Sequence, residues 1–348
     1  MALGDQALDD ASLSGANLTA IGHVALTANT SGSANTAVGS NALTANITGS
    51  DSVAMGVSAL GTNTTGNYNT ALGRSALVSN TTASNNTAVG YASGDAITTG
   101  AENAVFGSNA ASGLTVGQKN TALGAYALRN DTQGSSSVAI GHQALNAQNF
   151  TSATAVYNVA VGANTGVAVT TGVQNTLIGG LAGDALTEGT RNVAIGVGTL
   201  GADTLGSRST AVGTGALALQ NFTSATSSYN TAVGFDAGNA VTTGTNNTLI
   251  GGLAGDAITT GGSNTSVGAY SMTTLTTGSH NVAVGTSALD VTTTGSYNVA
   301  LGRDALGANT TASYNTALGY QAGYGVTTGQ FNTDIGGQAD LPLSVLVL

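Results

Sequence analysis

The sequence Asn-Thr-Ala-Val-Gly at residues 35–39 recurs from one end of the chain to the other and decides the fold. Related copies are Asn-Thr-Ala-Leu-Gly at residues 69–73 and Asn-Val-Ala-Val-Gly at residues 281–285. Aligned on the final glycine, there are 20 copies between Gly4 and Gly336. Of the 19 intervals between these glycines, 16 share the length of the interval from Gly56 to Gly73, one is longer by a single residue and two are longer by four. The chain is therefore a repeat protein with a 17-residue period.

The residues before each glycine alternate as in a β-strand. Thr or Val stands three residues before the glycine in 18 of 20 copies, Ala stands two before it in 15 of 20, and a large apolar residue directly precedes it in all. β-Branched residues with a period of two predict a strand. An Ala-Leu pair after the glycine predicts a second short strand, and a Thr-Thr-Gly turn closes the coil. The expected fold is an all-β, parallel β-solenoid of about 20 coils, spaced by ~4.8 Å.

The alternation also predicts which columns of residues face inward. The large apolar column is expected to fill the coil, and the Ala column, on the opposite face of the strand, to pack against another chain in a homotrimeric rod. Alternatively, the Ala column faces the opposite wall of its own coil. The predicted core ladder includes Val38, Leu72, Val89, Ile140, Val161, Ile195, Val233 and Val284.

Composition excludes several classes of function. Only 6% of residues are charged and the net charge is −10, so a nucleic acid is not an expected partner. The chain has no cysteine and therefore neither disulfides nor thiolate metal sites. No run of 18 apolar residues is present, so we expect no membrane insertion.

The repeat defines one domain at residues 1–338, followed by an apolar, non-repeat tail at residues 339–348. The two longest intervals predict expanded loops near residues 146–158 and 218–230, which lie in a duplicated block of four coils. The repeat starts at Met1 without a signal-peptide pattern, so the first coil is expected to stack end to end on another protein or a second copy. The tail is expected to leave the coils and dock on an apolar surface.

Residues with catalytic or binding chemistry are scattered. His23 and His142 follow repeat glycines and are expected to be surface variation, and no cofactor or metal is predicted. The asparagine that opens most repeats is expected to form a stacked amide row. Loops on a rigid scaffold often carry binding residues, so the expanded loops are candidate receptor contacts. Their aromatic residues are Phe150, Tyr157, Phe222 and Tyr229.

The repeated Asn-Thr-Ala-Val-Gly resembles the Asn-Ser-Val-Ala-Ile-Gly repeats of YadA-like heads in trimeric autotransporter adhesins. It also looks like repeats of phage and viral tail fibres with Thr-Thr-Gly turns. The resemblance covers residues 1 to about 338 and implies a left-handed parallel β-roll assembled as a trimer. The chain departs from the adhesin plan in its longer, 17-residue coil and in its lack of a heptad stalk, signal peptide and membrane-anchor strands.

Sequence and resemblance together predict a non-enzymatic structural or adhesive fibre. The expected context is a trimeric phage or viral tail-fibre shaft for host-surface attachment, located outside the cell on a virion. The alternatives are the head of a bacterial trimeric adhesin on a cell surface and, because of the regular threonine rows, an ice-binding solenoid. The expected partners are the chain itself and a host or cell-surface glycan or protein receptor. No paired carboxylates stand out against the repeat, which disfavours a glycan-cleaving enzyme.

Overall fold

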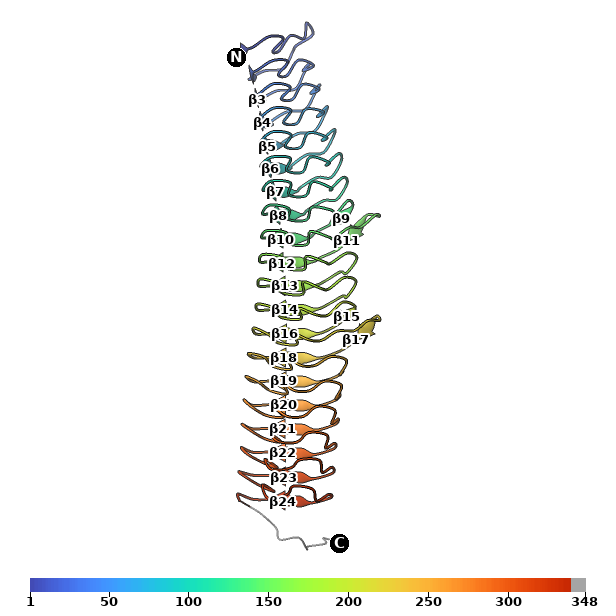
Figure 1. Ribbon diagram of the computed structural model, residues 1–348. Helices are drawn as coiled ribbons and strands as arrows, with labels where there is room; N and C mark the ends of the chain where they lie inside the picture. The colour runs from blue at the N-terminus through green and yellow to red at the C-terminus, as the bar shows by residue number, and fades with distance from the viewer. Residues whose placement is uncertain (339–348) are drawn as a thin grey trace. The chain divides into compact units, whose positions relative to one another are not determined.

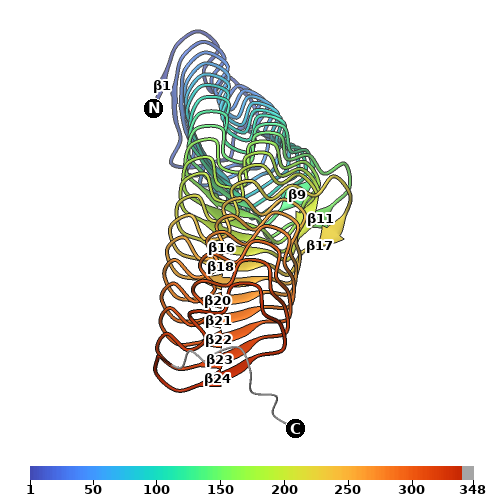
Figure 2. The same ribbon diagram turned by 60° about the horizontal axis from the view of Figure 1, so that its bottom comes forward.

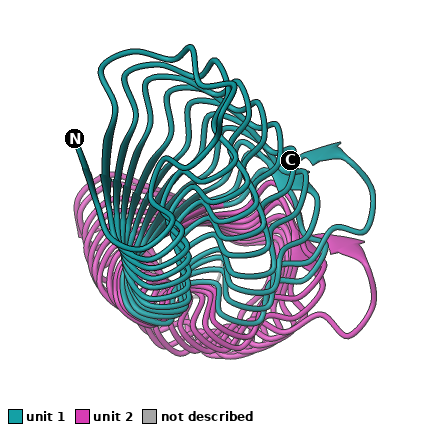
Figure 3. Cartoon of the chain, turned by 90° about the horizontal axis from the view of Figure 1, so that it is seen from above, with its two compact units in different colours: residues 1–175 teal, residues 176–348 magenta. Residues whose placement is uncertain are grey.

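The computed structural model describes residues 1–338, so the predicted docking of the tail at 339–348 lies outside the described residues. The chain divides into two compact units, residues 1–175 (unit 1) and residues from 176 onward (unit 2), coloured separately in Figure 3. Both units are built from the same element, a 17-residue coil that contributes one short strand to a parallel sheet.

Unit 1 contains a ten-stranded parallel sheet in which each strand pairs with the equivalent strand of the next coil (Figure 1). The pairing is in register, for example Thr36 with Val53 and Val38 with Met55. The strands of the sheet are β1 (Ala2–Leu3), β2 (Thr19–Ile21), β3 (Thr36–Val38), β4 (Val53–Met55), β5 (Thr70–Leu72), β6 (Thr87–Val89), β7 (Ala104–Phe106), β8 (Thr121–Leu123), β10 (Val138–Ile140) and β12 (Val159–Val161). A separate pair consists of β9 (Gly134–Ser135) and β11 (Thr154–Ala155).

Unit 2 repeats this plan with ten paired strands. They are β13 (Thr176–Ile178), β14 (Val193–Ile195), β16 (Thr210–Val212), β18 (Thr231–Val233), β19 (Thr248–Ile250), β20 (Thr265–Val267), β21 (Val282–Val284), β22 (Val299–Leu301), β23 (Thr316–Leu318) and β24 (Thr333–Ile335). A separate pair consists of β15 (Gly206–Ser207) and β17 (Thr226–Ser227). The prediction of an all-β parallel β-solenoid of about 20 turns is confirmed, and residues 1–338 contain no helix.

The inward face of the sheet is the alanine column, the middle residue of each strand. Ala37, Ala71, Ala160 and Ala283 are fully buried within the chain. The predicted assignment of the two faces is therefore wrong, and the alternative, in which Ala faces the opposite wall of its own coil, describes the structure. A small residue suits this column because the interior of the coil also holds large side chains from its turns, such as Leu43.

The large apolar column points outward instead of filling the coil. Ile195, Val233 and Val284 are 36%, 37% and 39% exposed. The other members of the predicted core ladder, Val38, Leu72, Val89, Ile140 and Val161, are half-buried. The interior is filled mainly by the leucine four residues after the repeat glycine, such as Leu43 and Leu145, which is fully buried.

A larger side chain at one interior position of a coil is matched by a smaller residue at another. Where Leu177 replaces the alanine of the strand, Gly183 replaces the interior leucine, and a Cβ on Gly183 would lie only 3.0 Å from a methyl group of Leu177. Ile97 likewise lies against Gly94, whose Cβ would be 2.9 Å from the Ile97 Cδ1. These pairs keep the filled volume nearly constant, as close packing requires.

The predicted second strand is also wrong, because the Ala-Leu pair lies in a turn. Leu43, Leu77 and Leu145 adopt φ values of 49°, 50° and 50°. This left-handed backbone turns the chain at the leucine and points its side chain into the coil. Burial of the leucine offsets the conformational cost of a positive φ.

The repeat glycine allows successive coils to approach closely. Gly73 has a φ of 136°, and a Cβ added to it would lie 2.3 Å from the carbonyl oxygen of Gly90 in the next coil. Gly336 has a φ of 121°, but nothing lies within 4 Å of its Cβ position. At Gly73, both the positive φ and the backbone of the next coil therefore favour glycine.

We predict that Gly73→Ala destabilises the fold more than Gly336→Ala. Both substitutions carry the strain of a glycine-only backbone, whereas only Gly73→Ala adds a clash with the next coil, worth a further ~1–3 kcal/mol. Chemical denaturation of the two variants measures this difference. If both variants lost the same free energy of unfolding, backbone strain rather than the close approach of the next coil would explain the glycine.

The asparagine column forms the stacked row that the sequence predicts. The Asn86 Oδ1 accepts from the backbone N–H of Asn103 at 2.9 Å, and its Nδ2 donates to the carbonyl of Gly100 at 2.8 Å. A second row, which the sequence analysis missed, consists of Asn29, Asn46, Asn63 and Asn80, joined by amide-to-amide hydrogen bonds of 2.7–2.8 Å. Both rows pair buried polar groups between coils and so fix the register.

Candidate functional site

The two expanded loops add strands beside the main sheets, where Figures 1 and 2 show them projecting beyond neighbouring coils. In unit 1 the loop at residues 149–158 contains β11, which pairs with β9 of the preceding coil. In unit 2 the equivalent loop contains β17, which pairs with β15. Each added pair gives its loop a backbone ladder of its own and so holds it in place.

The aromatic residues of these loops divide into two classes. Phe150 and Phe222 are only 7% and 5% exposed, so these two predicted contact residues present little surface to a receptor. They fold inward and cover the interior where the loop widens the coil. Tyr157 and Tyr229 are 58% and 54% exposed and remain available for contact.

A buried polar network holds the base of the first loop. The Asp131 Oδ1 accepts from the backbone N–H groups of Gly134 and Phe150 at 3.0 and 3.1 Å, and its Oδ2 accepts from the Gln148 Nε2 at 2.6 Å. The Gln148 Oε1 in turn accepts from the Asn158 Nδ2 at 2.9 Å. The network fixes Phe150 through its backbone, which explains its inward orientation.

Unit 2 contains the same network in the second copy of the duplicated block. Gln220 donates to Asp203 at 2.6 Å, Phe222 donates to Asp203 at 3.1 Å, and Asn230 donates to Gln220 at 2.9 Å. The same network occurs at both expanded loops. This indicates that it stabilises a coil that contains four extra residues. Because both aspartates are fully buried and occupied by these donors, they offer no free carboxylate to a ligand.

One exposed loop tyrosine has a cationic neighbour. The Arg208 guanidinium lies 5.5 Å from the ring centroid of Tyr229, and it also donates to the Ser227 hydroxyl. In unit 1 Ser136 stands where unit 2 has Arg208, so the two loops differ in charge around their tyrosines.

Unit 2 also has a row of stacked aromatic rings that the sequence analysis did not identify. Its members directly precede the asparagine column, a position that we call the turn column. His280 and Tyr297 have ring centroids 4.9 Å apart, Tyr297 and Tyr314 5.0 Å, and Tyr314 and Phe331 5.1 Å, with interplanar angles of 8° or less. We call these four residues the aromatic ladder. Their 17-residue spacing is the signal in the sequence that identifies them as one row.

The outward apolar columns form a second surface of interest, which we call the outer strip of each unit. The last residue of each main strand contributes to it. Exposure is 44% at Met55 and Leu123 in unit 1 and 49% at Leu318 in unit 2, and it is highest in the end coils, at 59% for Leu3 and 69% for Ile335. In unit 1 the strip comprises Leu3, Ile21, Val38, Met55, Leu72, Val89, Phe106, Leu123, Ile140 and Val161. In unit 2 it comprises Ile178, Ile195, Val212, Val233, Ile250, Val267, Val284, Leu301, Leu318 and Ile335.

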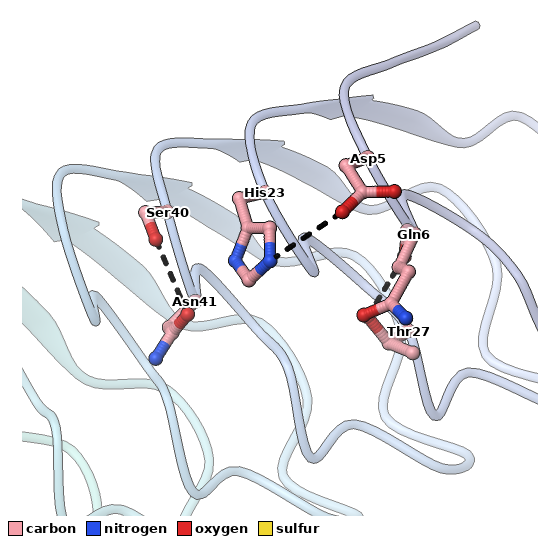
Figure 4. A network of polar contacts seen from close by, with 6 residues as sticks. All are labelled: Asp5, Gln6, His23, Thr27, Ser40 and Asn41. Carbon is pink, nitrogen blue, oxygen red and sulfur yellow. Dashed lines mark hydrogen bonds and ion pairs between the residues drawn. The ribbon is translucent and has the colours of Figure 1, made fainter.

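The histidines that follow repeat glycines lie on the surface, as expected. The His23 Nε2 is 3.8 Å from the Asp5 Oδ2, and the two side chains are 57% and 80% exposed (Figure 4). His142 packs edge to face against Tyr126 at 6.1 Å. Neither neighbourhood has the enclosed, oriented acid–base pair that catalysis requires.

Several carboxyl groups have shifted pKa values because of burial. Burial raises the pKa of Asp95, Asp184, Asp203 and Asp256 above the ordinary value of 3.8, and for Asp256 the nearby carboxylates of Asp236 and Asp290 add to this rise. The described residues contain no cluster of three or more His, Cys, Asp or Glu side chains suited to a metal ion.

These shifts predict that the protein becomes more stable as the pH falls below neutral. A carboxyl with a raised pKa binds its proton more tightly in the folded state, so the free energy of unfolding increases as the pH falls from above the folded pKa toward 3.8. The midpoint of thermal unfolding should be higher at about pH 4, close to the ordinary pKa, than at about pH 7. Asp203→Asn should reduce this rise, and Asp51→Asn, at an exposed position, should not. A midpoint that falls on acidification would contradict the prediction.

Across residues 1–338, no helix is long and apolar enough to cross a membrane. No protein-family model matches the chain, and no curated protein is significantly similar to it. The outer strips, the loops and the aromatic ladder are therefore the features from which a function can be inferred.

Proposed function

We propose that the chain is a non-enzymatic structural fibre protein that self-associates through its outer strips, as the shaft of a trimeric phage or viral tail fibre. The observation that carries this proposal is the apolar outer strip. In each unit it supplies ten large apolar residues in consecutive coils, with no charged residue among them. A soluble chain seldom leaves such a continuous apolar row exposed to water unless another surface covers it.

The size of the strip is suited to a protein interface. In unit 2, eight of the ten side chains are 36–69% exposed and present on the order of 500 Å², against about 800 Å² per partner in a standard interface. The first residue of each strand is Thr or Val in most coils and lies on the same face, which widens the apolar surface. With these residues the surface approaches the lower end of the range for stable complexes.

A second copy is the partner that best fits this surface. The strip repeats with the spacing of the coils, so only a surface with the same spacing can fill its grooves along the whole length, and another copy has that spacing. Valine and isoleucine are rigid and lose little entropy on packing. Trimeric assembly is the arrangement that the resemblance to adhesin heads and tail fibres implies.

The rest of the chain fits a fibre. A stack of near-identical coils can be lengthened by duplication, as the repeated four-coil block indicates. The exposed Tyr157 and Tyr229, in loops anchored by buried networks, are suited to contact with a host-surface receptor. In this proposal the chain is located outside the cell on a virion. The alternative is the head of a bacterial trimeric adhesin on a cell surface.

The genes that flank the coding region test this context. Neighbouring genes for structural virion proteins would support a tail fibre, and genes for secretion or membrane anchoring would support the adhesin. Antibodies raised against the purified chain should then label particles or cell surfaces in electron micrographs. Labelling confined to the interior of cells would overturn both contexts.

An ice-binding function is a second candidate, favoured by an exposed threonine column in unit 2. The neighbouring column is less suited to ice, because its hydroxyls bond to the backbone, as Thr276 does to Thr293 at 3.1 Å. Thermal hysteresis of the purified protein separates this function from a fibre. The exposed column comprises Thr243, Thr260, Thr277, Thr294, Thr311 and Thr328.

A further inference from the structure

We propose that the aromatic ladder of unit 2 binds a neutral, linear polysaccharide that lies along the coils. This inference rests on the proposed function, since it names the class of surface receptor that the fibre would contact. It adds a contact site outside the expanded loops, at residues 280–331, where four rings follow one another.

The rings are accessible although they are stacked. Tyr297 and Tyr314 are each 49% exposed and Phe331 is 75% exposed. Parallel rings in contact are separated by about 3.5–4 Å, so centroids 4.9–5.1 Å apart require neighbouring rings to be offset. The offset leaves part of each ring face uncovered. The ladder therefore presents a stepped, apolar surface with the spacing of the coils.

The local backbone does not explain why rings occupy this position. The turn column has a left-handed backbone, with φ values of 60° at Tyr297, 62° at Tyr314 and 58° at Phe331. Bulky residues are disfavoured there, and asparagine is the better choice, as at Asn85 and Asn246 in the same column. Turn formation therefore does not require a run of rings, and stacking still leaves much of each ring exposed to water.

The surroundings of the ladder are polar but uncharged. The Ser296 Oγ accepts from the backbone N–H of Ser279, and the Ser313 Oγ accepts from that of Ser296, both at 3.0 Å. Each of these hydroxyls still carries a proton that it can donate. Thr277 and Thr294 are exposed two residues before the serines. These stretches, residues 276–280, 293–297, 310–314 and 327–331, contain no Asp, Glu, Lys or Arg.

This combination fits one class of ligand. A sugar ring offers an apolar face of C–H groups, which packs on an aromatic face, and a rim of hydroxyls, which bond to serine and threonine. A polymer of such rings can repeat its contacts along a repeating surface. The lack of Asp, Glu, Lys and Arg favours a neutral polysaccharide over an acidic one, since these stretches contain no Lys or Arg to pair with carboxylates or sulfates.

Isothermal titration of the full chain with cellohexaose, xylohexaose and maltohexaose tests the proposal. We expect at least one hexasaccharide to bind, and Tyr297→Ser/Tyr314→Ser to weaken that binding by about tenfold or more. Tyr297→Phe/Tyr314→Phe, which retains the rings, should keep most of the affinity. Tyr68→Ser is the matched control. Tyr68 is 62% exposed in the same turn column, but its neighbours in that column are Asp51 and Asn85, so its loss should leave binding unchanged.

The outcomes distinguish this site from the proposed fibre. If none of the three sugars binds, or if the double serine variant binds as the wild type does, the ladder is not a glycan site, and the fibre proposal stands on its own tests. If the serine variant instead changes the number of associated chains, the ladder belongs to an interface between copies and the inference is overturned. Binding by a chain that remains a monomer would overturn the fibre and keep the site.

Discussion

Ala160→Asp is expected to prevent normal folding of the coils around β12, whereas Val161→Asp leaves the coil folded. Ala160 is fully buried and its neighbour Val161 is only half-buried. An unpaired carboxylate in the interior costs several kcal/mol, so we expect Ala160→Asp to lower the free energy of unfolding by about 5 kcal/mol or more. Circular dichroism and chemical denaturation at low protein concentration measure the effect.

The chain itself shows why this substitution would not be tolerated. Asp334 occupies the alanine column in the last described coil, where Gly323 provides room, because a Cβ there would lie 2.8 Å from the Asp334 Oδ2. Leu145, the residue equivalent to Gly323 in the coil before Ala160, leaves no such space. If Ala160→Asp and Val161→Asp destabilised the chain equally, the assignment of inner and outer faces would be wrong.

Placing three aspartates on the outer strip of unit 2 is expected to dissociate the assembly into folded single chains. The variant combines Val284→Asp, Leu301→Asp and Leu318→Asp, at residues that are 39%, 36% and 49% exposed. Charges buried without partners at an interface cost several kcal/mol in binding, enough to lower the association constant by at least about a hundredfold. Light scattering measures the number of associated chains, and circular dichroism verifies that the coils remain folded.

A matched variant distinguishes the strip from exposed apolar residues in general. Val291→Asp, Leu181→Asp and Leu219→Asp alter side chains that are 38%, 45% and 52% exposed but lie outside the strands. This variant should associate like the wild type. Dissociation of both variants would indicate a general effect of charge, and dissociation of neither would remove the strip from the proposed interface.

The sequence predicts the fold class because the 17-residue period and the strand alternation can be recognised whichever residue occupies each position in a given copy. It does not predict which face of the strand points inward, because alternation with a period of two looks the same whichever face is inside. The usual rule that large apolar residues are buried favoured Val38 and its equivalents. That rule failed because Leu43 already fills the thin interior, where only a small residue such as Ala37 fits against it.

The turns were harder to predict than the strands. An Ala-Leu pair suits a strand by propensity. Nothing in its local sequence indicates the left-handed backbone of Leu43, whose φ is 49°. The buried position of Phe150 was also hidden, since it depends on contacts with Asp131 in the preceding coil. The network could have been found from the duplicated block, because Asp131 and Gln148 both recur in its second copy as Asp203 and Gln220.

The aromatic ladder illustrates what a column-by-column comparison can recover. His280, Tyr297, Tyr314 and Phe331 occupy the same position in four consecutive copies of the repeat, and in-register pairing of coils places equivalent residues next to each other. Stacking of these rings therefore follows from the period alone. Their exposure does not, because it depends on the direction of the turn column relative to the sheet.

Native mass spectrometry of the full chain over a range of concentrations tests the central claim most directly. The claim is that the outer strips of several copies cover one another in a fibre. We predict a stable species of three times the 33.5 kDa chain mass, retained on dilution to the nanomolar range. A folded species of 33.5 kDa at every concentration would contradict the claim, because the outer strips would then remain exposed to water in the working protein.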